Sequence, residues 1–361
     1  MVHSSFLSVS LSLLSLFGLV NAICVKPAVR KEWRALTAAE RADWIDAVKC
    51  LASLPHDERL TPTVNRSISN IVPMNASSSY YDDFVYMHMI HFTGLFLPWH
   101  RWYVAVYESA LKERCGFKGV SPYWNWVEDS KDVFNSPMFK DSSPRSGLGG
   151  WGNPANDIRV PDGAFSNASS FRLTYPSPHT LRRNWTAQPF LNFPLPGFMT
   201  EAEEQVQANA TFTPAERDKL VHGFVGDYVG FQKYFEGFNG SHGAVHLMMG
   251  GDLGGKCPGD APSDCVGGPT FSANEPLFWM HHAMVDKMWY DWQNAHPVNK
   301  KAFFGGSVQA IQNATYYQEY PNGAPPFFSL NSTMPSDGLF PQARIQDVMS
   351  TTEGMLCYVY Q

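Results

Sequence analysis

Apolar residues recur at helical spacing in several parts of the chain, and a start or stop signal accompanies most of them. A capping box at Thr37 and Glu40 precedes the first such segment, and Pro55 follows it. Ser79 and Asn274 are suitable N-caps for later segments. The predicted helices cover residues 41–53, 80 to about 91, 102–114, a segment opening at Thr213, and 274 to about 295. This pattern predicts a mainly α protein with few short strands.

Between residues 128 and 211 the helical pattern stops, and the sequence becomes rich in Pro, Gly, Ser and Asn. Such a composition is typical of a linker between domains or of long surface loops. We favour loops, because the histidines on the two sides of the segment make chemical sense only together. The predicted architecture is a four-helix-bundle core that carries long irregular loops.

The first 22 residues predict a secretory signal peptide. Residues 6–20 are apolar and Ser-rich but too short to span a bilayer, and small residues follow at Asn21 and Ala22. Eight Asn-x-Ser/Thr sequons agree with a secreted glycoprotein, although chance alone would give several. We therefore expect an extracellular protein in which residues 23–361 form one domain.

Six cysteines follow the predicted cleavage point, an even number that suits an oxidising compartment. Six cysteines allow fifteen pairings, and the sequence alone does not choose among them. Cys257 and Cys265 flank a short Pro/Gly/Asp loop and are expected to pair. For the others we predict the pairs Cys50–Cys115 and Cys24–Cys357.

The charge pattern limits the class of partner. The formal net charge is −6 and no basic run occurs, which argues against nucleic acids and anionic membranes as partners. No segment after the predicted signal peptide is long and apolar enough to predict a membrane helix. The oligomeric state stays open.

Seven of the twelve histidines fall into two groups, His88, His91 and His100, then His242, His246, His281 and His282. His91 and His100 stand at the ends of the segment HFTGLFLPWH, which Gly and Pro interrupt. Their spacing of nine fits neither one helical face nor one strand, so we expect two side chains that reach one point from different elements. His242 and His246 are four residues apart, the spacing of a metal-binding pair on a helix.

One carboxylate and the five remaining histidines also bear on this histidine pattern. Asp286 stands one turn after His282 and could hold the N–H of a neighbouring histidine. The other five histidines, His179 among them, lie in the signal segment or in polar or helix-end contexts and predict no site.

The residue types limit the metal. Neutral imidazole suits copper, zinc, nickel and iron, and one triplet with a water would suit a catalytic zinc. Two triplets suggest two metals, each with an open position. Neutral ligands favour Cu(I), and two such ions can each give one electron to dioxygen. A zinc hydrolase is the alternative, but it would need a carboxylate base beside one triplet and no second triplet.

The segments YDDFVYMH, HFTGLFLPWHR, PYWNW, HGAVH and NEPLFWMHHAMVDKMW together resemble the tyrosinase/catechol oxidase family of type-3 copper proteins. The resemblance covers most of the chain from Arg30 to Tyr360. It implies two copper ions and the oxidation of o-diphenols to o-quinones with O2, with weaker monophenol hydroxylation. The copper ligands that it implies are His88, His91 and His100 for the first ion, and His242, His246 and His282 for the second.

Three further residues receive roles from the resemblance. Glu236 is the candidate carboxylate for a water linked to monophenol hydroxylation, with a solvated loop charge as the alternative. Phe278 is expected to pack over the first copper and limit access there, or to be ordinary core. His281 is expected to support the ligands without binding copper.

The chain departs from the family at several positions. Only two residues separate His88 from His91, so a helix would have to present both at i and i+3. Asn125 and Glu275 stand where the family carries aspartates. In similar enzymes that hydroxylate tyrosine, an asparagine often occupies the position of Gly243. Because the chain has glycine there, we expect diphenol oxidation to dominate.

In the family, a Tyr-x-Tyr near the end of the catalytic domain packs on an N-terminal arginine and precedes a C-terminal lid. Tyr358, Tyr360 and Arg30 match this pattern, which predicts a cation–π contact and an enzyme made without a covalent lid. An o-aminophenol oxidase would use the same ligands. A dioxygen carrier, the alternative of another class, would bury the copper pair under an extra domain.

Overall fold

The computed structural model describes residues 24–61, 74–87, 90–193 and 195–361. The predicted signal peptide and His88 lie outside these residues.

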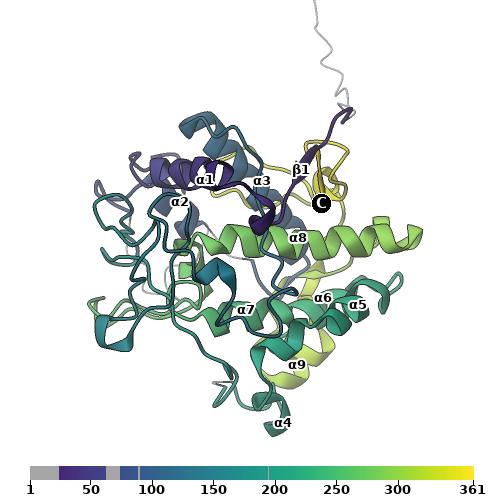
Figure 1. Cartoon of the computed structure of the whole chain (residues 1–361). Coiled ribbons are helices and arrows are strands. Elements are labelled where there is room, and N and C mark those ends of the chain that lie inside the picture. Colours follow the sequence, from purple (N-terminus) through teal and green to yellow (C-terminus); the bar gives the residue numbers. More distant parts are fainter. Residues whose placement is uncertain (1–23, 62–73, 88–89, 194) are drawn as a thin grey trace, which may run out of the picture.

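Helices dominate the described chain, which confirms the predicted fold class. Figure 1 shows α8 (Leu277–Ala295) across the middle, with α1 (Ala38–Leu51) on one side and α5 to α7 on the other. The long helix α3 (Phe96–Cys115) packs along α8, and the rings of Tyr107 and Trp279 stack at 3.6 Å between centroids. The remaining helices are α2 (Tyr80–Tyr86), α4 (Glu201–Glu204), α5 (Pro214–His222), α6 (Tyr228–Glu236), α7 (Ser241–Met249) and α9 (Ala314–Glu319).

The capping box of α1 is confirmed, because the side chains of Thr37 and Glu40 each accept the other's backbone N–H. The helix begins three residues earlier and ends two residues earlier than the predicted range 41–53. The start of α8 differs from the prediction. Asn274 lies in a 3-10 turn, and its amide donates to the carbonyl of Tyr175 instead of capping the helix. Helix α8 therefore begins at Leu277, directly after Pro276.

Two predicted boundaries around the first histidine group are wrong. Helix α2 ends at Tyr86, so His91 lies on a loop, and the idea that one helix presents His88 and His91 does not hold. Helix α3 begins at Phe96, before Pro98, because proline fits the first helical turn, where no intrahelical N–H bond is needed.

The interruption between His91 and His100 is at Gly94, and Pro98 lies within α3. A Cβ on Gly94 would lie 2.8 Å from the Cα of Gly305, so only glycine allows the two backbones to approach this closely. The same segment carries Phe92 at a φ of 53°, a left-handed conformation that is uncommon for a side-chain-bearing residue. In the described part of this loop, residues 92–94 are therefore constrained by the close approach to Gly305 and by the left-handed conformation of Phe92.

Two small sheets complete the described secondary structure. Strand β1 (Ala28–Arg30) pairs in parallel with β4 (Tyr358–Tyr360), and β2 (Gly306–Val308) pairs antiparallel with β3 (Ala324–Phe327). All three predicted disulfides are confirmed, namely Cys24–Cys357, Cys50–Cys115 and Cys257–Cys265. The first of them ties β1 to β4.

The irregular segment 128–211 packs against the helical core. Among its described residues, the helical elements besides α4 are short 3-10 turns at Pro137–Phe139, Pro154–Asn156 and Ala208–Phe212. Arg183, which is fully buried, donates to the carbonyl of Gly149 at 2.8 Å and makes a two-bonded ion pair with Glu275. This buried ion pair fastens the segment to Glu275, two residues before the start of α8.

In the part of the chain that the structure describes, no helix combines the length and apolarity that a bilayer-spanning helix needs.

Strands β1 and β4 both contact α8 through one buried carboxylate. The carboxylate of Asp286 accepts from Arg30 and Arg101 and from the hydroxyls of Tyr358 and Tyr360. The guanidinium of Arg30 also lies over the Tyr358 ring at 3.7 Å, which confirms the predicted cation–π contact. Burial by itself would raise the pKa of Asp286, but Arg101 and Arg30 hold it below its usual value. This stabilisation is therefore present at neutral pH and is lost as the pH falls through the carboxyl range.

We expect Arg30→Leu to lower the unfolding free energy of the protein by about 3 kcal/mol, because the change removes a buried positive charge that pairs with the carboxylates of Asp286 and Glu108. Urea unfolding at pH 7 measures this loss. The control is Lys31→Ala on the neighbouring residue, whose ion pair with Glu40 lies in water. An equal effect of both substitutions would contradict the role of the buried pair.

Candidate metal centre

Four histidines from two helices form one buried cluster. His242 and His246 lie on α7, and His281 and His282 lie on α8. One nitrogen from each lies within 4.8 Å of the others, a spacing at which four ligands can reach a common ion. The Nε2 atoms of His246 and His282 are 3.3 Å apart.

Two histidines of the first group join this cluster. His100 on α3 stacks on His282, with ring centroids 4.3 Å apart and planes at 12°. His91, on the loop before α3, lies 5.5 Å from both His100 and His242, measured between ring centroids. The predicted convergence of His91 and His100 from different elements is confirmed. All of the predicted site histidines that the structure describes therefore lie together.

Backbone carbonyls orient two of these rings. The Nδ1 of His100 bonds the carbonyl of Phe96 at 2.7 Å, and the Nδ1 of His246 bonds that of Leu253 at 2.9 Å. A carbonyl only accepts, so Nδ1 carries the proton and the lone pair lies on Nε2. The Nε2 lone pair is the one available to a metal in both rings.

The electrostatics of the cluster fit a metal. Burial lowers the pKa of His100 to about 3 and that of His246 to about 4, so both rings are neutral at pH 7. Among the described residues, several buried histidine nitrogens bond no protein atom: His100 Nε2, His242 Nε2, His282 Nδ1 and both nitrogens of His281. Buried polar atoms normally have partners. Neutral imidazoles with free lone pairs are good ligands for copper or zinc.

The structure differs from the predictions for Asp286 and His281. Asp286 contacts arginines and tyrosines and no histidine among the described residues, because two guanidinium groups compete for its oxygens. His281 was expected beside the ligands, yet its ring nitrogen lies within the four-histidine group. The sequence signal for this was the adjacent pair His281-His282, where successive helical residues can both border one point.

Glu236 is buried, which excludes the alternative of a solvated loop charge. It ends α6, and its carboxyl accepts from the backbone N–H of Phe92 and from the amide of Gln232. Burial raises its pKa to about 8. The carboxyl therefore stands beside the residue that follows His91, in a mostly protonated state at pH 7.

Phe278 lies one turn before His282, and its ring contacts that histidine at 4.2 Å between centroids. His246 is the next histidine ring, at 6.1 Å. The side chain is fully buried. Phe278 therefore covers one edge of the histidine cluster on the side of α7 and α8.

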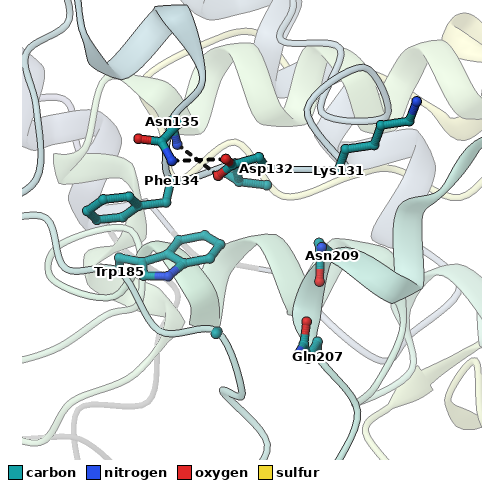
Figure 2. Close-up of a pocket in the computed structure, with 9 residues that line it drawn as sticks. Lys131, Asp132, Phe134, Asn135, Trp185, Gln207 and Asn209 are labelled. Atoms are coloured by element: carbon teal, nitrogen blue, oxygen red, sulfur yellow. Dashed lines mark hydrogen bonds between the residues drawn. The ribbon is translucent and has the colours of Figure 1, made fainter.

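A cavity of about 440 Å³ lies elsewhere, lined by residues 131–135, 185, 187, 207 and 209. Figure 2 shows Phe134 and Trp185 on one side of it and Gln207 and Asn209 on the other. None of its lining residues is a histidine, so it is separate from the cluster.

Comparison with known proteins identifies the family. Residues 78–295 match the model of the common central domain of tyrosinase, which is more than half of the chain. The chain belongs to the tyrosinase family. The match includes all six described histidines of the cluster. Members of this family hold two copper ions, and the buried imidazoles described above suit that metal.

Relatives extend over nearly the whole chain. Tyrosinase-like protein phomQ1' of Diaporthe leptostromiformis is 31% identical and covers 94% of this chain and 81% of its own. Tyrosinase P of Aspergillus terreus is 26% identical and covers 93% of each chain. A variant of the polyphenol oxidase from Thermothelomyces thermophila is 26% identical, with a TM-score of 0.63 over 93% of this chain and 89% of that one. This protein is thus a copper-dependent phenol oxidase of the tyrosinase family.

The pKa of Glu236 predicts a pH-dependent stability in the copper-free protein. Its pKa lies above that of the unfolded chain, so the burial penalty grows as the pH rises from about 4.5 to about 8. Glu236→Gln should therefore match the wild type at pH 4.5 and exceed it by a few kcal/mol at pH 8.5. Urea unfolding at the two pH values measures the difference.

Glu203→Gln is the control of opposite sign. The backbone N–H of Thr200 lowers the pKa of Glu203, so this substitution should lose stability at the higher pH. A Glu236→Gln variant that also loses stability at pH 8.5 would contradict the assignment of a protonated carboxyl.

Proposed function

We propose that this protein is a secreted type-3 copper oxidase that converts o-diphenols to o-quinones with O2. Two molecules of diphenol and one O2 give two quinones and two waters. The observation that carries the proposal is the cluster of buried, neutral imidazoles from α3, α7, α8 and the loop before α3. The three disulfides support secretion, since such bonds persist in oxidising compartments.

The proposed ligands of the first copper are His88, His91 and His100, and those of the second are His242, His246 and His282. The copper pair supplies the electron transfer between the phenol and O2 when it is bound. The protein residues supply position and a water-excluding wall. His281 is close enough to the second group to replace a ligand or to hold one in place.

Two residues border the proposed substrate position. Phe278 excludes water from one edge of the cluster and limits access there. Glu236, whose carboxyl accepts the Phe92 N–H and is mostly protonated at pH 7, is the candidate to donate a proton there and to take one back once it has ionised. Gly243, the residue after His242, provides no side chain that could assist the carboxyl. For this reason we propose diphenol oxidation as the main activity and monophenol hydroxylation as the weaker one.

An o-aminophenol oxidase is the alternative function within the same chemistry. Assays with catechol, tyrosine, tyramine and o-aminophenol on copper-loaded protein separate the possibilities. Catechol should be the fastest substrate. Rapid tyrosine turnover without a lag or added catechol would overturn the preference for diphenols.

Copper analysis tests the ligands. We expect about two copper ions for each wild-type chain and about one after His242→Ala, because that change removes a ligand from one ion only. Elemental analysis of the purified protein gives the ratio. His222→Ala is the control, since His222 is exposed at the end of α5. Zinc in place of copper, or a full copper content in His242→Ala, would contradict the assignment.

Gly243→Asn tests the preference between substrates. The backbone has room for a side chain, since a Cβ there would lie 3.3 Å from the Phe238 carbonyl oxygen and needs only a small shift. We expect the ratio of tyrosine to catechol activity to rise about tenfold, because the amide could hydrogen-bond and position a water that accepts the phenolic proton, and a positioned proton acceptor contributes at least this much. Gly243→Ala, which adds bulk without an amide, should leave the ratio unchanged. Equal effects of both substitutions would contradict the role of the amide.

A further inference from the structure

The turn that follows α7 is held by a buried ion pair outside the histidine cluster. Asp252 and Arg182 are almost fully buried. One carboxylate oxygen of Asp252 accepts the backbone N–H of Arg182 at 2.7 Å, and the backbone N–H of Asp252 donates to the carbonyl of Arg182 at 3.0 Å. The two residues therefore fix each other through both backbone and side chain.

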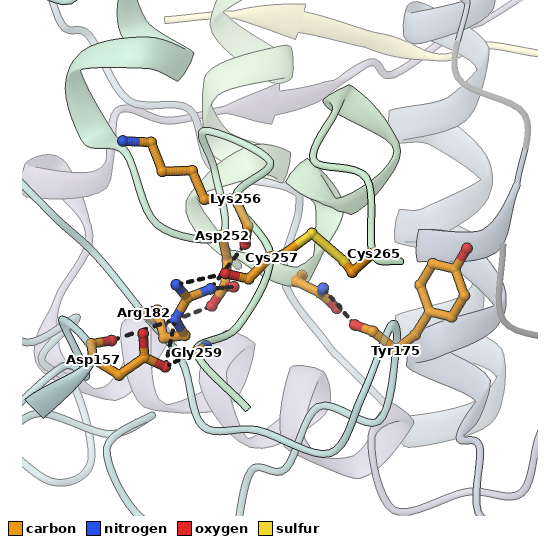
Figure 3. The surroundings of a disulfide bond; sticks show 9 residues. Asp157, Tyr175, Arg182, Asp252, Lys256, Cys257, Gly259 and Cys265 are labelled. Atoms are coloured by element: carbon orange, nitrogen blue, oxygen red, sulfur yellow. Dashed lines mark hydrogen bonds and ion pairs between the residues drawn. A yellow bond between two sulfur atoms is a disulfide. The ribbon is translucent and has the colours of Figure 1, made fainter. Parts of the chain in front are cut away.

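Arg182 connects this turn to the disulfide loop, as Figure 3 shows. Its guanidinium donates to the carbonyl oxygens of Lys256 at 2.8 Å and Cys257 at 3.1 Å. Cys257 is bonded to Cys265, so the loop is also closed covalently. At the outer side, the guanidinium pairs with Asp157 at 3.0 Å.

His179 completes the contacts of the Asp252 carboxylate. Its Nε2 lies 3.2 Å from the carboxylate, and its Nδ1 bonds the carbonyl of Ser177. Burial would lower the pKa of His179, but Asp252 raises it above the usual value. The carboxylate is thus surrounded by donors from a segment 70 residues earlier in the sequence.

The residue after Asp252 contacts the candidate metal centre directly. The carbonyl of Leu253 accepts the Nδ1–H of His246 and so selects the tautomer with a free Nε2. The turn has little freedom to move, because Gly251 has a φ of 48° and its missing Cβ would lie 2.2 Å from the Arg182 carbonyl oxygen. The position of this carbonyl therefore depends on the ion pair next to it.

We propose that Asp252 and Arg182 are positioning residues for the second copper, which act by holding the Leu253 carbonyl that orients His246. This inference rests on the proposed function, because it takes His246 as a copper ligand. Partners that orient a ligating histidine typically contribute about 10- to 100-fold in metal affinity. The sequence assigned no role to either residue, and the hydrogen bonds of the pair go to His179, Asp157 and backbone groups instead of to the histidine cluster.

Asp252→Asn tests the proposal in the full-length protein. We expect about a tenfold or greater loss of Cu(I) affinity at one of the two copper positions, measured by competition with a Cu(I) chelator. The other position should keep the affinity of the wild type. Arg182→Lys, which keeps the charge but loses the two-carbonyl contact, should show the same direction and carries the test if Asp252→Asn does not fold.

Asp157→Asn is the matched control, because it removes the outer partner of the same guanidinium and leaves the Leu253 turn untouched. We expect it to lower the melting temperature of the copper-free protein slightly and to keep both copper affinities within about twofold. A folded Asp252→Asn or Arg182→Lys with unchanged copper affinity overturns the proposal. So does an equal loss of affinity in Asp157→Asn, which would mean that general destabilisation is the cause.

The two proposals fail in different ways. If the wild type binds no copper pair, the proposed function is wrong. If the wild type binds two copper ions and the Asp252 variant binds them equally well, only the positioning role is wrong.

Discussion

The buried carboxylate of Asp286 fixes the relation between the two longest helices. It lies on α8 one turn after His282, and its partner Arg101 follows His100 on α3. A shift of either helix would break a buried ion pair, which costs more than an exposed one because neither charge could return to water. The stacked rings of His100 and His282 depend on this register.

The histidine cluster differs from this ion pair, because several of its buried ring nitrogens bond no protein atom. Burial makes the rings neutral, and neutral rings repel each other less than charged ones would. The charged groups that join the two helices, Asp286 and Arg101, bond each other and make no hydrogen bond to a described histidine of the cluster. A carboxylate in the cluster would attract a proton or a harder cation, so its absence among the described ligand candidates agrees with a site for copper.

Local signals in the sequence predicted much of this arrangement. The capping box at Thr37, the four-residue spacing of His242 and His246, and the apolar stripe of α8 each depend on neighbours along the chain. The predictions were wrong where the structure depends on residues that are distant in the sequence. Asp286 contacts arginines that lie 256 and 185 residues earlier, and Glu236 is buried by a loop that contains Phe92. The break before α3 depends on Gly305, more than 200 residues after Gly94, which no local pattern around Pro98 could reveal.

The irregular segment 128–211 holds two helices in place, a role that its composition does not predict. Two adjacent residues in it, Arg182 and Arg183, hold the two helices of the second histidine group. Arg182 fixes the turn after α7 through Asp252, and Arg183 pairs with Glu275, whose carboxylate also accepts the N–H of Leu277 at the start of α8. Because the two side chains leave the backbone next to each other, any displacement of this loop would move the end of α7 and the start of α8 together. An irregular loop can therefore preserve the geometry of a metal site as strictly as a helix does, provided that buried arginines anchor it at both helices.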